Sequence, residues 1–157
     1  MKLSFPDVRM SVRASVSAGL AVFAAQLAQL EYPIYAMIAA VLVTDLATSQ
    51  TRGLAVPRLV GTILGAGMGA AISVVLPHGV IAVCFGILVT MLLSYVAGLH
   101  DASKVAGYIC GIVLLSYGDN PWFYAFHRFL ETVLGIGMAV LVSFVPRLVT
   151  LPGERSK

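Results

Sequence analysis

The chain has 157 residues, of which 59% are hydrophobic and only 11% are charged, and its mean hydropathy is +0.95. Soluble domains carry roughly 25% charged residues, so this composition excludes an ordinary soluble protein and indicates a membrane protein. The net charge of +3 does not indicate nucleic-acid binding, because the basic residues lie between apolar runs, where they act as topology signals. Cys84 and Cys110 lie within apolar runs and provide neither a disulfide framework nor a metal site.

Six apolar runs predict six membrane-spanning helices. In chain order they cover about residues 10–30, 33–48, 54–76, 79–98, 102–117 and 121–145. The first run is longer than the roughly 7 to 15 apolar residues of a signal peptide, so it is interpreted as a retained span. We therefore expect an all-α membrane protein, with one transmembrane domain over residues 1–157 and no soluble domain.

The basic residues predict the orientation of this domain. With six spans, nine of the ten Lys and Arg residues fall on one side and only Arg128 on the other. Because cytoplasmic loops are enriched in Lys and Arg, both termini are predicted to be cytoplasmic.

Two stretches of the chain repeat at an offset of 70 residues. The residues Arg58, Thr62, Leu64, Gly65, Gly67 and Met68 recur as Arg128, Thr132, Leu134, Gly135, Gly137 and Met138. The copies cover about residues 10–76 and 79–145. Since each copy holds three spans, an odd number, the second is expected to be inverted relative to the first, as in many secondary transporters.

The repeated arginines have different candidate partners. Glu131 lies three residues after Arg128, on the same helix face, whereas Gly61 occupies the equivalent position after Arg58. The nearest acid for Arg58 is Asp45. We hypothesise two charge centres, Arg58 with Asp45 and Arg128 with Glu131, in which protonation of a carboxylate would release an arginine to an anion. The alternative is a pair of structural ion pairs that hold helix ends.

Small residues form a stripe in each copy. Gly61, Gly65 and Gly69 are spaced by four residues, and Gly135 and Ala139 repeat this spacing. Such spacing lets helices approach closely, so we expect it to mediate packing between the two halves or between subunits.

A guanidinium offers a planar fork of donors that fits a carboxylate, which favours an anionic substrate. Aromatic side chains are available to stack on an aromatic acid: Tyr35, Tyr108, Trp122, Phe123, Tyr124, Phe126 and Phe129. The cluster at 122–129 is equally typical of an interfacial aromatic belt, which we favour. The three histidines share no ligand spacing, and no hydrolase motif is present. We therefore predict no enzyme, no cofactor and no metal site.

Several short motifs carry a family resemblance. They are Arg13 at the start of the first run, Pro33-Ile34-Tyr35, Thr51-Arg52-Gly53, Arg58-Leu59-Val60-Gly61-Thr62 with Gly65, and Arg128-Phe129-Leu130-Glu131-Thr132 with Gly135. Together they resemble the membrane domain of the fusaric acid resistance and aromatic acid exporter family. The resemblance implies a bacterial inner-membrane exporter of aromatic carboxylic acids, distantly similar to plant malate channels. By position it assigns Arg13, Arg58 and Arg128 to the anion pathway.

The chain departs from that family at Tyr35, where tryptophan is expected, and in lacking the large cytoplasmic domain of many members. The leading interpretation is an organic-anion exporter that works in the lipid bilayer as a homo-oligomer, with a dimer favoured. Proton coupling, a passive anion channel and a separate accessory subunit remain open. A different class of protein, a non-transporting membrane subunit that scaffolds a partner, is also retained.

Overall fold

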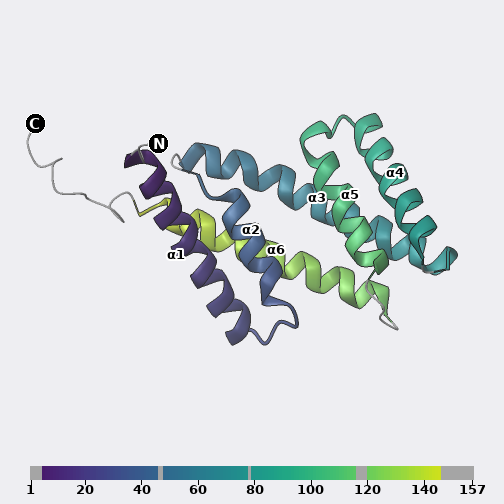
Figure 1. Cartoon of the computed structure of the whole chain (residues 1–157), viewed down its shortest axis with the longest axis horizontal. Coiled ribbons are helices and arrows are strands. Elements are labelled where there is room, and N and C mark those ends of the chain that lie inside the picture. The colour runs from purple at the N-terminus through teal and green to yellow at the C-terminus, as the bar shows by residue number, and fades with distance from the viewer. Residues whose placement is uncertain (1–4, 46–47, 78, 116–119, 146–157) are drawn as a thin grey trace, which may run out of the picture. The chain divides into compact units, whose positions relative to one another are not determined.

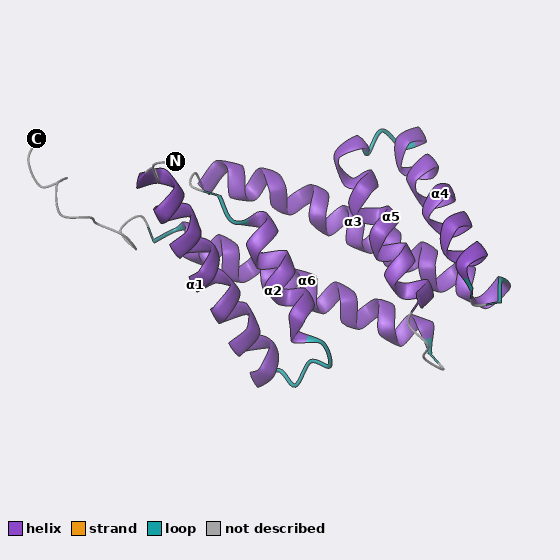
Figure 2. Cartoon of the chain, in the orientation of Figure 1, coloured by secondary structure: helices purple, strands orange, loops and turns teal. Residues whose placement is uncertain are grey.

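The computed structural model describes residues 5–45, 48–77, 79–115 and 120–145, and all regular structure in these ranges is helical. Six helices follow one another: α1 (Phe5–Leu27), α2 (Pro33–Val43), α3 (Thr48–Val75), α4 (Val80–Val96), α5 (His100–Leu115) and α6 (Pro121–Ser143) (Figures 1 and 2). The predicted all-α class is confirmed. The predicted end of the fifth run, at residue 117, lies outside the described residues.

Proline and glycine mark the helix boundaries. Pro33 and Pro121 begin α2 and α6, where the missing N–H costs nothing and the fixed φ suits the first helical position. Gly98 adopts a φ of +73° in the turn between α4 and α5, a conformation that favours glycine. The expected start of the third run at residue 54 is too late. α3 begins at Thr48 and runs through Pro57, which removes only one backbone hydrogen bond.

Three of the described helices are long and apolar enough to cross a membrane. They are α1 from Asp7 to Leu27, α3 from Ser49 to Val75, and α6 from Pro121 to Ser143. With 11, 17 and 16 residues, α2, α4 and α5 are shorter. At about 1.5 Å per residue they extend roughly 16, 25 and 24 Å, against a hydrocarbon core of about 30 Å. The count of six spans stays a prediction.

The helices form two compact units. Residues 1–54 and 134–157 form unit 1, and residues 55–133 form unit 2. Unit 1 contains the α1–α2 hairpin and unit 2 the α4–α5 hairpin, while α3 and α6 each contribute to both units (Figure 1). The units are therefore not the two sequence copies, because each combines helices of both.

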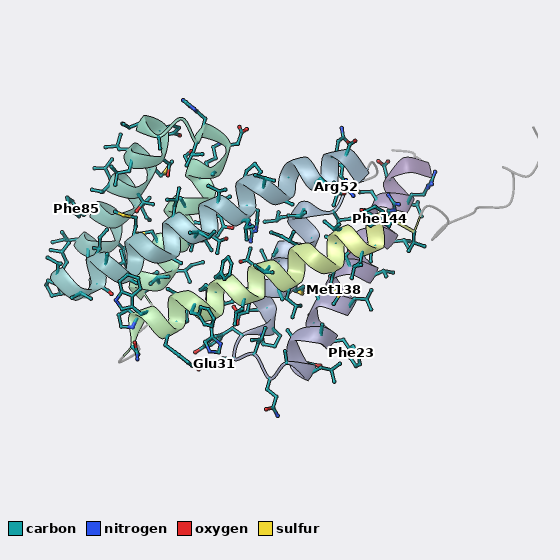
Figure 3. The ribbon with its side chains drawn as sticks, turned by 180° about the vertical axis from the view of Figure 1, so that it is seen from behind. Phe23, Glu31, Arg52, Phe85, Met138 and Phe144 are labelled. Atoms are coloured by element: carbon teal, nitrogen blue, oxygen red, sulfur yellow. The ribbon has the colours of Figure 1, made fainter. Side chains whose placement is uncertain are left out.

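Small side chains form the interior of both units. The cluster in unit 1 is built on Ala21, Ala25, Ala36 and Ala40, and the one in unit 2 on Ala66, Ala70, Ile109, Val113 and Ala125. Large apolar side chains such as Phe23 and Phe85 are exposed instead (Figure 3). Helices in a bilayer gain no hydrophobic driving force from burying large side chains and associate through close packing of small ones. The burial pattern supports a membrane protein.

Equivalent glycines of the two copies make equivalent contacts. A methyl group on Gly65 would overlap the carbonyl oxygen of Ala106 in α5, and one on Gly135 would overlap that of Ala36 in α2. Ala106 and Ala36 are themselves 70 residues apart. The glycine-rich helix of each copy therefore packs on the second helix of the other copy, once in each unit. At Gly67 and Gly137 an added methyl would meet nothing within 4 Å.

Candidate functional site

Arg128 and Glu131 form a buried ion pair in the first half of α6. The Arg128 Nη1 atom lies 3.4 Å from Glu131 Oε2, and the side chains are only 1% and 0% exposed. The Arg128 Cζ atom also lies 4.6 Å from the centroid of the Tyr124 ring, one turn earlier. Arg128 follows the helix start by seven residues, or about 10 Å at 1.5 Å per residue. Breaking such a pair by removing one partner leaves an uncompensated buried charge.

The threonines that follow the two repeated arginines meet in unit 2. The Oγ1 atoms of Thr62 and Thr132 lie 3.5 Å apart, and both side chains are buried. The Thr62 hydroxyl donates a hydrogen bond to the Arg58 carbonyl oxygen at 2.9 Å. Equivalent residues of the two sequence copies are thus in direct contact.

Arg58 has a different environment from Arg128, although only 6% of it is exposed. Its Cζ atom lies over the Tyr108 ring, 5.5 Å from the centroid. Its Nε atom is buried, and no described residue accepts a hydrogen bond from it. The predicted pairing with Asp45 joins a residue of unit 2 to one of unit 1 and stays a prediction.

Packing explains why the first copy has no acid at the position of Glu131. A side chain at Gly61 would place its Cβ 2.5 Å from the Cβ of Val105 and 2.8 Å from the Ala102 carbonyl oxygen. These distances are shorter than van der Waals contact, so the start of α5 leaves no room for a carboxylate there.

Arg13 binds the ends of two helices in unit 1. Its Nη1 donates to the carbonyl oxygen of Asp45, just after α2, at 3.3 Å. Its Nη2 donates to the carbonyl oxygens of Ser143 and Val145, at the end of α6, at 3.3 and 3.4 Å. Carbonyl groups at helix C-termini lack intrahelical partners and carry partial negative charge, which an arginine neutralises. The sequence gives no signal for these contacts, since Arg13 and Ser143 lie 130 residues apart.

Several aromatic side chains at the start of α6 are exposed. Trp122, Phe123 and Phe126 are each 57% exposed, as expected for an interfacial belt rather than a closed stacking site. At the other end of α6, Phe144 lies beside Arg52, whose Cζ atom is 5.0 Å from the ring centroid (Figure 3).

The described part of unit 2 has at least two hollows. One, of about 280 Å³, lies between α3 and the α4–α5 turn and is lined by Val56, Pro57, Val60, Gly98, Leu99, His100, Asp101 and Ala102. The other, of about 430 Å³, is almost wholly apolar and runs along the exposed face of α4 from Cys84 to Tyr95. In the described part of the chain, no group of three His, Cys, Asp or Glu residues is placed to hold a metal ion.

A family model described as fusaric acid resistance protein-like matches residues 20–142. The chain belongs to this family. The match confirms the resemblance inferred from the short motifs, and it includes both repeated arginines and the glycine stripes. Arg13 lies outside the matched residues. No curated protein and no solved structure matched the chain. Membership in the fusaric acid resistance protein-like family, together with the apolar helices, indicates a membrane protein with a role in transport.

Proposed function

We propose that this protein exports organic anions, with aromatic carboxylates as the leading substrates, along a pathway that includes Arg58 and Arg128. The observation that carries the proposal is the burial of two repeat-related arginines in long apolar helices. A charge within a membrane span costs about 2.5 to 3.5 kcal/mol on insertion scales, so such residues usually serve a substrate or ion pathway.

The two arginines differ in how their charge is balanced, and this difference supports an order in which the anion meets them. The charge of Arg128 is balanced by Glu131, whereas Gly61 leaves Arg58 without an acid on its own helix. In the proposed cycle the anion binds first at Arg58. Protonation of Glu131 then frees Arg128 to receive the anion, and return of the proton to the cytoplasmic side couples export to the proton gradient.

The geometry of the copies supports alternating access. The matched glycine contacts and the meeting of Thr62 with Thr132 fit two copies related by a two-fold axis, which the span count predicts to be inverted. α3 passes from unit 1 to unit 2 between Leu54 and Ala55. Pro57 lacks an N–H, so the Gly53 carbonyl oxygen loses its usual helical partner at this junction, which makes it a bending point for α3.

We assign Arg13 to the structure of unit 1 rather than to the anion pathway, because it donates to three backbone carbonyl oxygens at helix ends. The proposal also includes a bacterial inner-membrane location with cytoplasmic termini, from the distribution of basic residues, and a homodimer as the working assembly. It requires no cofactor and no catalytic residue.

The test is transport by purified protein in liposomes. Uptake of radiolabelled benzoate is measured for the wild type, Arg58→Ala, Arg128→Ala and the control Arg52→Ala, with passive leak of benzoic acid subtracted. Arg52 is the matched control because it also lies on α3 but contacts Phe144. We expect the first two variants to lose flux and the control to retain it.

A pH gradient across the same liposomes then separates the modes of transport. Accumulation of benzoate against its own gradient, lost in Glu131→Gln, supports proton coupling through this carboxylate. Equilibration without accumulation indicates a passive channel. If a panel of aromatic and aliphatic acids shows no flux, the transport proposal fails and the scaffold interpretation takes its place.

A further inference from the structure

Arg58 differs from Arg13 and Arg128 in how its guanidinium is satisfied. Arg13 donates to backbone carbonyl oxygens, and Arg128 faces a carboxylate. Arg58 lies over the face of Tyr108, as Arg128 lies over that of Tyr124, but no carboxylate balances its charge on α3, and its buried Nε has no acceptor among the described residues. A buried donor without an acceptor costs free energy, since the protein gives up a hydrogen bond to water without replacing it.

The Nε atom belongs to one edge of the guanidinium, which it shares with a neighbouring Nη atom. This edge offers two parallel N–H groups, and their spacing matches the two oxygens of a carboxylate. A contact with the face of an aromatic ring does not supply an acceptor for these groups. The edge is therefore available for a two-point interaction with an anion.

Tyr108 is held in a fixed position relative to Arg58. It lies on α5, whose backbone meets α3 closely at three points: Ala102 with Gly61, Ala106 with Gly65, and Cys110 with Gly69. The Tyr108 side chain is itself partly exposed, so burial in the core does not require an aromatic residue at this position. A cation over a ring face gains more when it is desolvated, and Arg58 is almost fully buried.

We infer that the Nε edge of Arg58 is a two-point carboxylate site and that Tyr108 is a positioning residue that fixes the plane of this guanidinium. The inference rests on the proposed function and names the binding geometry at the same site. Because Nε is buried and only 6% of Arg58 is exposed, the carboxylate reaches this edge when α3 and its neighbours separate during the transport cycle.

The test compares KM and maximal rate for benzoate in liposomes. Arg58→Lys keeps the charge but loses the planar fork, so we expect KM to rise about 10- to 100-fold. Tyr108→Leu removes the ring face and is expected to raise KM about 3- to 10-fold with a smaller change in maximal rate. Tyr108→Phe retains the ring face and is expected to keep KM within about twofold of the wild type.

Tyr95→Leu is the matched control, because Tyr95 is a similarly exposed tyrosine of unit 2 on the neighbouring α4. It should leave KM unchanged, and its unfolding temperature in detergent should equal that of Tyr108→Leu. A purely structural role for Tyr108 would lower the unfolding temperature without this selective rise in KM, which would overturn the assignment of Tyr108.

Further outcomes separate this inference from the proposed function. If Arg58→Ala abolishes flux but Arg58→Lys keeps the wild-type KM, Arg58 acts as a point charge, so the two-point site is wrong while the transport function stands. If Tyr108→Phe is as impaired as Tyr108→Leu, the hydroxyl group and not the ring face is required, which also overturns the assignment. If the wild type transports no anion, the proposed function fails first.

Discussion

The matched glycines of the two copies allow a quantitative test of how the helices pack. Gly65 and Gly135 each face a backbone carbonyl oxygen of a neighbouring helix, whereas Gly67 and Gly137, two residues later in each copy, face open space. Alanine at either of the first two positions forces a methyl group into a neighbouring backbone, which cannot rotate away as a side chain can.

The expected change in the free energy of unfolding follows from these contacts. Overpacking of a closely packed contact costs about 1 to 3 kcal/mol, so Gly65→Ala and Gly135→Ala should be destabilised by that amount. Gly67→Ala and Gly137→Ala meet no obstacle and should gain about 0.5 to 1 kcal/mol, because glycine is a poor helix former. A difference of about 1.5 to 4 kcal/mol corresponds to roughly 3 to 15 °C in unfolding temperature for a chain of this size.

The assay uses the two cysteines. Cys110 is buried and Cys84 is exposed, so in a Cys84→Ser background a thiol-reactive fluorophore reports unfolding in detergent through Cys110. The four glycine variants are compared at one heating rate, since unfolding of membrane proteins is often irreversible. Equal unfolding temperatures for Gly65→Ala and Gly67→Ala, or for Gly135→Ala and Gly137→Ala, would refute the packing argument for that unit.

Three further predictions concern other parts of the chain. Arg13→Gln should lower the unfolding temperature by several degrees because three helix-end carbonyl oxygens lose a charged donor, whereas Arg9→Gln, one turn earlier on α1, should change it little; equal effects would contradict the structural role. In the folded protein, a membrane-permeant maleimide should label Cys84 much faster than Cys110, measured by mass spectrometry; comparable labelling would contradict the burial of Cys110. Pro57→Ala restores a backbone hydrogen bond inside α3, so it should raise the unfolding temperature and slow benzoate turnover; unaltered turnover would argue against bending of α3 at this point.

Local features of the chain were readable from its sequence. The apolar runs and the prolines at 33 and 121 predicted helices whose observed ends mostly agree, because helix formation depends on periodicity and on backbone constraints within a few residues. The same reasoning placed Arg128 and Glu131 on one helix face, where their side chains lie 3.4 Å apart. It did not predict that α3 begins six residues earlier, at Thr48, because residues 48–53 are mostly polar and precede the apolar run.

The choice of partner for each helix was decided by the tertiary structure. The spacing of Gly61, Gly65 and Gly69 predicts a close approach to some helix, but any smooth helix surface satisfies that requirement. Only the folded chain shows that this surface is α5 and that Gly135 meets α2.

The contacts of Arg58 and Arg13 were likewise decided by the tertiary structure. The sequence by itself determined that this is a helical membrane protein built from two copies of one motif, with an arginine in each copy, because these properties follow from composition and local spacing. The tertiary structure decided that Arg58 lies over Tyr108 and that Arg13 binds the ends of α2 and α6. These contacts join different helices, and those of Arg13 join residues separated by 32 to 132 positions in the sequence. Such contacts are fixed by how complementary surfaces pack, which no local pattern encodes.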